Sequence, residues 1–451
     1  MKYRQLNSKE ILKSKRFDGS YHNADVNIYN SVITSHSSHT LSFYCSEIFT
    51  SGRNKRVYTK AEFGDPFLSN SDASSSDPFN TCKYSSKKYG YDESALLKGG
   101  MILTGRVGAI GQTVFVPKYW EKYRAQGSDN IIRIVVKPQF KNGFIYAYLA
   151  SKIGNLSFWK HAIGGVQPFI TDKMVGQLPI PDFSESFQQE VDNLMQEATR
   201  LREEASDALE YAISFFNTLF PVPFKDNCLG KVSSKEIMTS INKRFEASFH
   251  ISEGKDIDKY IKEHYEWKSL GEVCSNISRP DIFKRYYVKN GITFLGGADI
   301  FLATPDSEKR LSKTKTENIS QLAIKEGTIL LPRSGTIGNV AWAHAGHAQK
   351  LASEDVIRLL PNDILRAGYV YAFLASKYGK LLIQRYIFGS VIQHVEPPHL
   401  KLIPVPIIDQ KTMDDIHDKI MIYSSAMGKA IEFEQKAIRM VEQEIEKWNK
   451  H

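Results

Sequence analysis

GFIYAYLASKIG, residues Gly143–Gly154, returns 225 positions later as GYVYAFLASKYG, residues Gly368–Gly379. Four further stretches recur in the same order at offsets between 225 and 228. These stretches start at Arg16, Phe67, Gly100 and Leu178, and their second copies start at Arg244, Phe294, Gly327 and Ile403. Chance does not give five matches in one order at nearly one spacing. So long a period fits a duplicated domain with its linker better than a solenoid.

Both copies have the same predicted layout. Apolar residues at helical spacing predict a helix over Gly143–Lys152, and the β-branched run Ile131–Val136 predicts a strand. Each globular part ends in a Pro-x-Pro doublet, at Pro179 and Pro404, and a long helix follows. The segments between the matches differ freely, as expected for related binding modules with divergent loops. The sequence therefore predicts an α+β protein with two duplicated, mixed α/β domains separated by long helices.

The two long helices each carry a narrow apolar stripe. After Pro181 the apolar residues alternate at spacings of four and three, which is typical of a coiled-coil seam. The C-terminal series has an extra step and the polar Glu434, which predict a local stutter or kink near Gly428. We expect the helices to pair as an antiparallel coiled coil; packing of each helix on its own globular part is the alternative. The predicted seam residues are Phe187, Val191, Leu194, Leu201, Phe215, Ile416, Ile420, Tyr423, Ile438, Val441 and Ile445.

These features divide the chain into four parts. Residues 1–182 and 221–405 are the globular domains, and residues 183–220 and 406–451 are the central and C-terminal helices. Pro221 is expected to end the first helix, because proline cannot continue one. At about 1.5 Å per residue, a helix of about 36 residues spans roughly 54 Å, enough to hold two globular domains apart.

The net charge of +9 is distributed unevenly along the chain. It is +10 over residues 1–182, −6 over 183–220, +7 over 221–405 and −2 over 406–451. Basic surfaces gain affinity for DNA by releasing its counterions. Two basic domains with acidic helices therefore predict two DNA footprints and helices suited to a protein partner. A charge spread evenly over each domain, aiding only solubility, is the alternative.

Two corresponding basic pairs are candidate DNA contacts. Lys55-Arg56 and Lys284-Arg285 are each followed within a few residues by a tyrosine and a lysine. Basic residues beside a tyrosine suit contact with phosphates and occasionally with base edges. Basic pairs in loops are also often only solvated, and the sequence leaves both interpretations open.

A glycine-rich turn in each copy carries a further candidate. Arg106 lies in GRVGAIG and Arg333 in PRSGTIG. Glycine lets the backbone approach a ligand closely, and arginine can donate two hydrogen bonds to guanine or phosphate. A turn that both copies need for folding is the alternative. Lys313 and Lys315 lie in a polar loop of the second domain, which differs from Ser69–Asp77 in the first, as expected where different bases are read.

No catalytic site is recognisable in the sequence. There is no Asn/Asp-Pro-Pro-Tyr/Phe tetrad of adenine methyltransferases, no phosphate-binding GxxxxGK[ST] loop and no convincing carboxylate–carboxylate–lysine nuclease cluster. Cys45, Cys82, Cys228 and Cys274 form no C-x-x-C pair, so we expect reduced structural thiols and no metal. His22 and His250 recur, but one histidine per copy favours a structural role. No signal peptide or membrane span is evident, and we expect a cytoplasmic protein.

The combination of these motifs is informative about the family. With its tandem domains, Arg-Phe-Asp/Glu opening, Arg-x-Gly-x-Ile-Gly turn, Pro-x-Pro exit and long helices, the chain resembles the specificity subunit of type I restriction-modification systems. The resemblance covers essentially all 451 residues. The usual Pro-Pro-x-x-Glu-Gln exit survives only partly, as Ile408-Asp409-Gln410 in the second copy and Phe187-Gln188-Gln189 in the first.

This resemblance implies that each globular part is a target recognition domain for one half of a split, asymmetric site in double-stranded DNA. The paired helices would act as a spacer and dock two modification (methyltransferase) subunits, with two restriction subunits where the system has them. S-adenosylmethionine, ATP and Mg²⁺ would belong to those partners, and this chain would hold no cofactor and catalyse nothing. The alternatives are an unfamiliar nuclease or methyltransferase, a coiled-coil scaffold that binds only proteins, and a specificity subunit whose partner fuses methyltransferase and nuclease.

Overall fold

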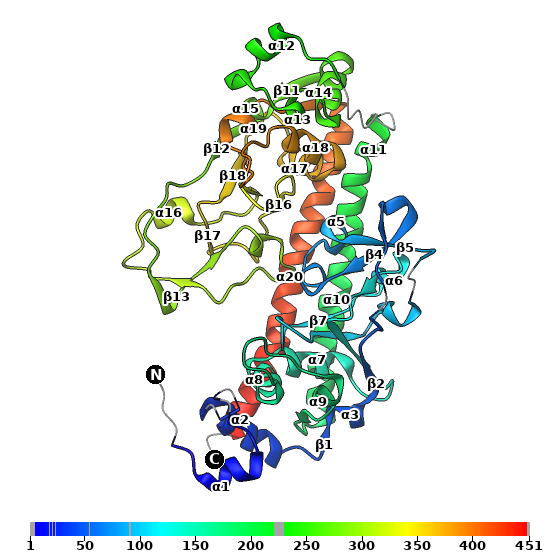
Figure 1. Ribbon diagram of the computed structural model, residues 1–451, viewed down its shortest axis with the longest axis vertical. Coiled ribbons are helices and arrows are strands. Elements are labelled where there is room, and N and C mark those ends of the chain that lie inside the picture. Colours follow the sequence, from blue (N-terminus) through cyan, green and yellow to red (C-terminus); the bar gives the residue numbers. More distant parts are fainter. Residues whose placement is uncertain are drawn as a thin grey trace. The chain divides into compact units, whose positions relative to one another are not determined.

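The computed structural model describes residues 5–17, 19, 21–22, 24–53, 55–89, 92–220 and 230–448. It divides into two compact units, Met1–Glu203 with Lys429–His451 (unit 1) and Glu204–Gly428 (unit 2). Each unit contains one copy of the sequence repeat and a part of each long helix (Figure 1). The four-part division expected from the sequence stays a prediction, and Pro221 and Cys228 lie outside the described residues.

Unit 1 combines short helices with short strands. Its helices are α1 (Ser8–Ser14), α2 (Ala24–Ser35), α3 (Leu41–Tyr44), α4 (Asn70–Ala73), α5 (Pro78–Thr81), α6 (Tyr119–Lys122), α7 (Asn142–Ala150), α8 (Lys152–His161), α9 (Asp172–Gly176) and the first part of α10 (Glu185–Ser214). Its strands are β1 (His39–Thr40), β2 (Cys45–Phe49), β3 (Tyr58–Thr59), β4 (Gly64–Leu68), β5 (Lys83–Ser86), β6 (Ile102–Gly105), β7 (Thr113–Phe115), β8 (Gln126–Gly127), β9 (Ile131–Val136) and β10 (Pro179–Ile180).

Unit 2 repeats this plan. Its helices are the last part of α10, α11 (Phe216–Leu219), α12 (Ser234–Thr239), α13 (Ala247–His250), α14 (Glu253–His264), α15 (Leu270–Val273), α16 (Ile319–Leu322), α17 (Ala367–Ala375), α18 (Lys377–Arg385), α19 (Pro397–Leu400) and the first part of α20 (Gln410–Trp448). Its strands are β11 (Glu266–Ser269), β12 (Cys274–Ser278), β13 (Tyr287–Leu295), β14 (Arg310–Leu311), β15 (Ile329–Pro332), β16 (Ala341–Trp342), β17 (Leu351–Ala352), β18 (Val356–Pro361) and β19 (Pro404–Ile407).

The central antiparallel sheet is the same in both units. Its strand order is β2-β9-β6-β7 in unit 1 and β12-β18-β15-β16 in unit 2. The registers also correspond, since Ile102 lies opposite Ile134 as Ile329 lies opposite Leu359. A second sheet pairs β4 with β8, and β13 with β17, in parallel. The structure therefore confirms the predicted duplication of a mixed α/β domain, including the strand over Ile131–Val136.

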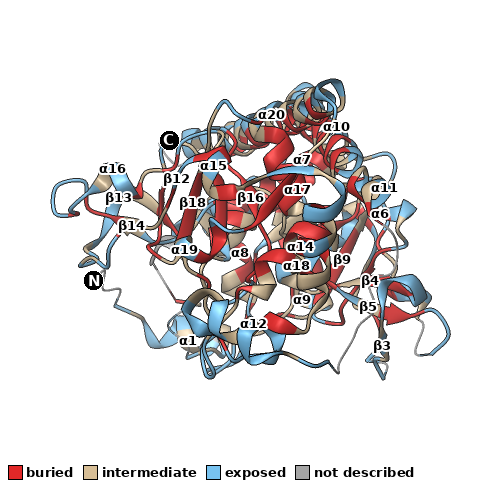
Figure 2. Cartoon of the chain, turned by 90° about the horizontal axis from the view of Figure 1, so that it is seen from above, coloured by how far each residue is buried: buried red, intermediate tan, exposed pale blue. Residues whose placement is uncertain are grey.

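The repeated GFIYAYLASKIG motif forms a buried pair of helices. α7 and α17 are buried along nearly their whole length, as Figure 2 shows. Ser151 ends α7 and caps α8, its hydroxyl oxygen accepting from the Gly154 amide at 3.0 Å. A Cβ on Gly154 would lie 2.1 Å from the Tyr148 carbonyl oxygen, so this close approach requires glycine. The motif is thus conserved between the copies because the fold needs it.

In unit 1, α10 and α20 run antiparallel and share one core. Arg202 of α10 contacts Glu434 of α20, and Phe183, just before α10, stacks on Trp448 near the end of α20. Both helices also pack on the globular part of unit 1, which is the helix's own globular part for α10 but belongs to the other repeat for α20. The core combines buried residues of the sheet and of α7 and α8 with Val191, Met195, Ala437, Val441 and Ile445.

Glu434 is a buried member of this helix interface, only 5% exposed. Its carboxylate accepts hydrogen bonds from the Tyr146 hydroxyl and from Arg202 Nη2. α20 is one continuous helix from Gln410 to Trp448, so the stutter or kink predicted near Gly428 does not interrupt it. Ala430 and Ala437 are fully buried, whereas Ile438 is only partly buried. Together with the buried Glu434, the two alanines keep the alternating spacing of four and three along the seam.

The parts of the helices in unit 2 also contact one another. The Tyr211 hydroxyl donates to Asp415 Oδ2 at 2.9 Å, and Lys419 lies over the Tyr211 ring. The predicted seam is narrower than the observed stripe, since Met195, Leu209, Phe216 and Ala437 are also buried. Buried residues of the predicted seam are Val191, Leu201, Ile416, Ile420, Tyr423, Val441 and Ile445, while Phe187, Leu194, Phe215 and Ile438 are partly buried.

Cys45, Cys82 and Cys274 are buried free thiols, and burial raises the pKa of each to about 12. Within the described residues no group of histidine, cysteine, aspartate or glutamate side chains is arranged to hold a metal ion. In the same part of the chain, no helix has both the length and the apolar character needed to cross a membrane.

Candidate nucleic-acid interface

A buried arginine on the central sheet shapes the loop beside it in each unit. Arg133 of β9 is fully buried. Its Nη1 donates to the carbonyls of Ser128 (3.3 Å) and Ile131 (2.8 Å), and its Nη2 donates to those of Ala95 (3.1 Å) and Gly127 (2.5 Å). Burial lowers the pKa of Arg133 to about 10, so the guanidinium stays charged at neutral pH.

Arg358 of β18 repeats this arrangement in unit 2. It donates to the carbonyls of Ser353 (2.8 Å), Val356, Leu322 (3.2 Å) and Ala352 (2.6 Å), which correspond in sequence to the four acceptors of Arg133. Burial likewise lowers the pKa of Arg358 to about 10. Because a buried charge is costly unless its hydrogen bonds are satisfied, each arginine fixes the backbone of its loop.

The loop fixed in this way carries a carboxylate that binds the second member of each predicted basic pair. Asp129 forms an ion pair with Arg56, and Glu354 forms one with Arg285. The two guanidinium groups also lie over corresponding aromatic rings, that of Phe67 at 5.2 Å in unit 1 and that of Phe294 at 5.5 Å in unit 2. Arg56 and Arg285 are therefore held in equivalent positions, with side chains still 41% and 38% exposed.

The residues around these arginines form the same exposed pattern in both units. Lys-Arg-x-Tyr-x-Lys occurs as residues 55–60 and again as residues 284–289, and we call these segments the basic strips. Lys55 and Lys284 are exposed, and so are Tyr58 (43%) and Tyr287 (52%). Exposed lysine, arginine and tyrosine side chains in one segment suit contact with a phosphate backbone. A pocket beside the Arg56–Asp129 pair hollows the surface there in unit 1.

The predicted arginine turns lie next to the same fixed loops. The Arg106 amide donates to the Asn130 carbonyl at 2.8 Å, and the Arg333 amide donates to that of Asp355 at 2.7 Å. Gly108 and Gly335 have φ of +77° and +78°, and a Cβ there would meet nothing within 4 Å. Glycine is therefore needed in these turns for its left-handed backbone and not for a close contact within the protein.

The two arginine side chains differ in their partners. Arg333 donates to Glu396 Oε1 at 2.7 Å and lies 3.4 Å from Asp355 Oδ1. Burial alone would lower the pKa of Arg333, but its hydrogen bond to Glu396 and the two carboxylate charges outweigh this and raise it. Among the described residues, the Arg106 guanidinium has no ion-pair or hydrogen-bond partner. Arg106 is thus the more available of the two for an external anion.

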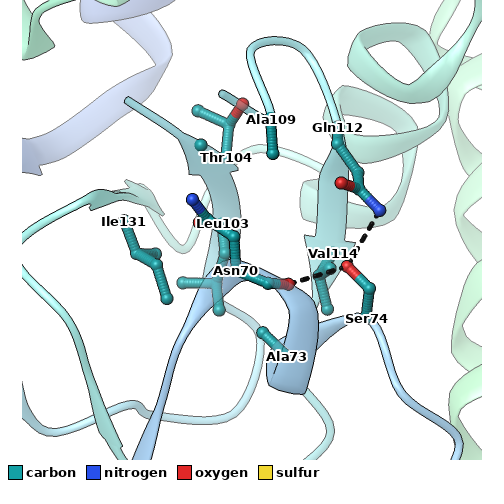
Figure 3. A pocket seen from close by; sticks show the side chains of 10 residues that line it. Asn70, Ala73, Ser74, Leu103, Thr104, Ala109, Gln112, Val114 and Ile131 are labelled. Carbon is teal, nitrogen blue, oxygen red and sulfur yellow. Dashed lines mark hydrogen bonds between the residues drawn. The ribbon is translucent and has the colours of Figure 1, made fainter. Parts of the chain in front are cut away.

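Lys313 and Lys315 are exposed in the loop that follows β14. The Ser312 hydroxyl accepts from the amides of Thr314 and Lys315 and so shapes this loop. In unit 1 the divergent segment Ser69–Asp77 contains α4 and lies beside the turn of Arg106. A pocket marks this junction, where Gln112 donates to the Ser74 hydroxyl and Ser74 donates to the Asn70 carbonyl (Figure 3).

The sequence interpretation missed the anchors of this surface. Ser-Asp-Asn-Ile-Ile-Arg ends at Arg133 and recurs 225 positions later as Ser-Glu-Asp-Val-Ile-Arg, ending at Arg358. That match could have identified the buried arginines and their carboxylate loops. His22 Nε2 donates to the Arg16 carbonyl at 2.8 Å and His250 Nε2 donates to the Arg244 carbonyl at 2.7 Å, which agrees with a structural role.

Residues 262–443 match the model of the type I restriction modification DNA specificity domain. This part of the chain is similar in sequence to that domain. It contains the second basic strip, the Arg333 turn and the Arg358 anchor of unit 2. Because unit 1 has the same sheet, register and buried arginine, it has the fold of a second specificity domain. The resemblance recognised in the sequence is thereby confirmed.

Solved structures of similar proteins include the S subunit of a type I restriction-modification system from M. genitalium, at 13% identity over 91% of this chain and 94% of that one, with a TM-score of 0.32. The HsdS subunit from Thermoanaerobacter tengcongensis matches at 15% identity, over 90% and 95%, with a TM-score of 0.28. A chain from a study of type I R-M complex assembly and conformational transition matches at 16%, over 91% and 96%, with a TM-score of 0.30. No curated protein matches this chain significantly.

Proposed function

We propose that this chain is the DNA-recognition subunit of a type I restriction-modification complex and that each unit binds one half of a split site. One observation carries the proposal. Two copies of a specificity-domain fold keep the same exposed basic strip, while the loops next to it differ. A shared basic strip suits the phosphate backbone, which is the same at every site, and divergent loops suit base sequences that differ.

The two halves of the site should differ in sequence, and the site should not be palindromic. The polar loop with Lys313 and Lys315 has no equivalent of the same sequence in Ser69–Asp77. Base edges in the major groove present different donor and acceptor patterns, so different loop side chains select different bases.

We further propose that two methyltransferase subunits bind, one for each repeat, and that restriction subunits join them to supply ATP-driven cleavage. S-adenosylmethionine, ATP and Mg²⁺ would then be held by these partners and not by this chain. The acidic character of residues 183–220, with a net charge of −6, makes the helices poor DNA ligands and better surfaces for a protein. A complex that modifies cellular DNA would work in the cytoplasm.

The helices are proposed to set the number of unread base pairs between the two half-sites. This spacer role can be tested by inserting seven residues, about two turns, into α10 and the same number into α20. The gap between the half-sites should become longer. An unchanged gap in a folded variant with the same half-sites would contradict the spacer role.

The proposed function is tested by mapping adenine methylation across the host genome with and without this gene. Loss of methylation at one split motif on deletion is the expected result. Exchanging residues 221–405 for the corresponding part of a related chain should then change only one half of the motif. Unchanged methylation, together with failure of a methyltransferase to co-purify, would contradict the proposal.

A scaffold that binds only proteins is the second candidate, favoured by the long helix pair alone. The two candidates differ in DNA affinity and in its dependence on salt. A DNA-recognition subunit should bind its site with an affinity that falls steeply as salt rises, because phosphate contacts release counterions. A scaffold should show no preference for the site at any salt concentration.

A further inference from the structure

Each unit carries a short hairpin with a fully exposed valine at its tip. The hairpins, residues 163–169 and 388–394, are closed by bridges between Ile163 and Phe169 and between Phe388 and His394. Val166 is 103% exposed and Val391 is 93% exposed. The two valines are 225 positions apart and therefore occupy equivalent places in the duplicated fold.

The fold explains the glycine of each hairpin but not the valine. Gly164 and Gly389 have φ of +104° and +98°, and a Cβ would lie 2.7 Å and 2.4 Å from a carbonyl oxygen three residues later. Glycine is therefore required at both positions. A side chain that stands in solvent stabilises the fold little, and substitutions at such positions usually change stability by less than about 0.5 kcal/mol. Retention of an exposed valine in both copies thus calls for another reason.

The hairpins are joined directly to the arginine turns. The Ile170 amide donates to the Arg106 carbonyl at 3.0 Å, and the Val395 amide donates to the Arg333 carbonyl at 3.0 Å. Further bridges link Val107 with Phe169, and Ser334 with His394. Hairpin, arginine turn and carboxylate loop are therefore connected in the same way in both units.

The hairpin tips carry no charge. Between the bridging residues the sequences are Gly-Gly-Val-Gln-Pro in unit 1 and Gly-Ser-Val-Ile-Gln in unit 2. Both consist of small, aliphatic and amide side chains, next to a turn that holds an arginine. The major groove of DNA admits a two-stranded ribbon, offers thymine methyl groups for apolar contact, and presents adenine edges that amide side chains can bind.

We propose that the two hairpins enter a groove of the half-sites, where Val166 and Val391 make apolar contacts with base edges. This inference rests on the proposed function and assigns contacts within it. The basic strips and arginine turns hold the phosphates, and the uncharged tips reach the bases between them. The valines therefore contribute to affinity for the cognate site without a share in its salt dependence.

The test replaces both valines by aspartate in the full-length chain, co-expressed with the modification subunit of its host system. Affinity for the split site defined by the methylation map is measured at several salt concentrations. Loss of a buried valine contact lowers affinity about tenfold per hairpin, and the repulsion of aspartate by phosphate adds to this loss. A second variant with serine at both positions removes the apolar contact without adding charge and should also bind more weakly, with an unchanged salt slope.

Ile364→Asp is the matched control, because Ile364 is a 51% exposed aliphatic residue whose counterpart in unit 1 is the polar Gln139. It should bind the site like the natural chain. The inference would be overturned if both valine variants bound the site as tightly as the natural chain. It would also be overturned if the variants lost the modification subunit but kept their DNA affinity, since the hairpins would then contact protein. If the natural chain itself does not prefer the site, the proposed function fails rather than the assignment of the hairpins alone.

Discussion

Replacing Glu434 by leucine should destabilise unit 1, because Arg202 would stay between the helices without its carboxylate. In the natural chain Arg202 Nη2 lies 2.5 Å from Glu434 Oε2, and the Tyr146 hydroxyl donates to Oε1 of the same carboxylate. Burial and the charge of Glu434 hold the pKa of Tyr146 well above its usual value, so the phenol remains a donor.

The expected loss follows from these contacts. Removing one member of a buried ion pair costs about 3–5 kcal/mol, because the other charge is left uncompensated. The Tyr146 hydroxyl loses its acceptor at a further cost of about 1 kcal/mol, and burial of the leucine side chain returns about 1.5–2 kcal/mol. The net decrease in the free energy of unfolding of unit 1 is therefore about 3 kcal/mol.

Unit 2 indicates how to rescue this variant. The residues that correspond to Arg202 and Glu434 are Met427 and Leu209, both buried. The free energy of unfolding of the double variant Arg202→Met, Glu434→Leu should therefore lie within about 1 kcal/mol of that of the natural chain. Apolar residues of similar volume often replace a buried ion pair without loss of stability.

Hydrogen exchange of peptides from α10 and α20, measured across a urea series, reports the stability of unit 1 directly. Glu432→Leu, at an exposed position of α20, is the control and should change stability by less than about 0.5 kcal/mol. The reasoning is refuted if Glu434→Leu is as stable as this control. It is also refuted if the double variant loses as much unfolding free energy as the two single variants together.

Three further predictions concern other parts of the molecule. Burial lowers the pKa of His347 from 6.5 to about 4, so the unfolded chain binds a proton more readily below pH 6.5. The neutral imidazole's contribution to stability is complete above that pH and is lost as the pH falls towards 4. The free energy of unfolding, measured with urea, should therefore fall by about 2 kcal/mol between pH 7 and 5, and His347→Gln should remove this part of the pH dependence. Arg133→Met leaves four buried carbonyls without their donor and should lower the free energy of unfolding, measured by urea titration, by at least about 3 kcal/mol. A decrease below about 1 kcal/mol would mean that water replaces the guanidinium. Arg106→Ala should reduce the magnitude of the salt slope of DNA binding by about one. Arg333→Ala should reduce this slope less, because Glu396 already neutralises the charge of Arg333. Equal changes in slope would show that the carboxylates do not decide which arginine is available to bind phosphate.

The sequence was sufficient to predict the duplicated domain and the position of its best-defined elements. The repeat GFIYAYLASKIG is visible because the close contact at Gly154 and the serine cap at Ser151 tolerate little change. The seam was predicted less well around Glu434. Hydrophobicity favoured Ile438 as a seam residue, whereas the close packing of the helices in unit 1 buries the smaller Ala437 fully.

The candidate interface was predictable only in part. Lys55-Arg56 and Lys284-Arg285 were recognised because basic pairs in loops are conspicuous, but their carboxylate partners lie about 70 positions away in the sequence. Arginine in a strand is usually exposed, so the sequence alone gives no reason to bury Arg133 or Arg358. Only the fold shows that their side chains point inward. The pairing of Arg333 with Glu396 likewise depends on how distant segments meet.

The buried arginines have a consequence for how such a chain can change during evolution. Among the described residues, Arg133 and Arg358 donate their hydrogen bonds to main-chain carbonyls alone, which every amino acid provides. Side chains on the anchored loops can therefore be exchanged without weakening the hydrogen bonds that shape the loops. A lineage under pressure to acquire new target sequences could alter recognition residues one at a time, and each intermediate would still present a well-formed surface.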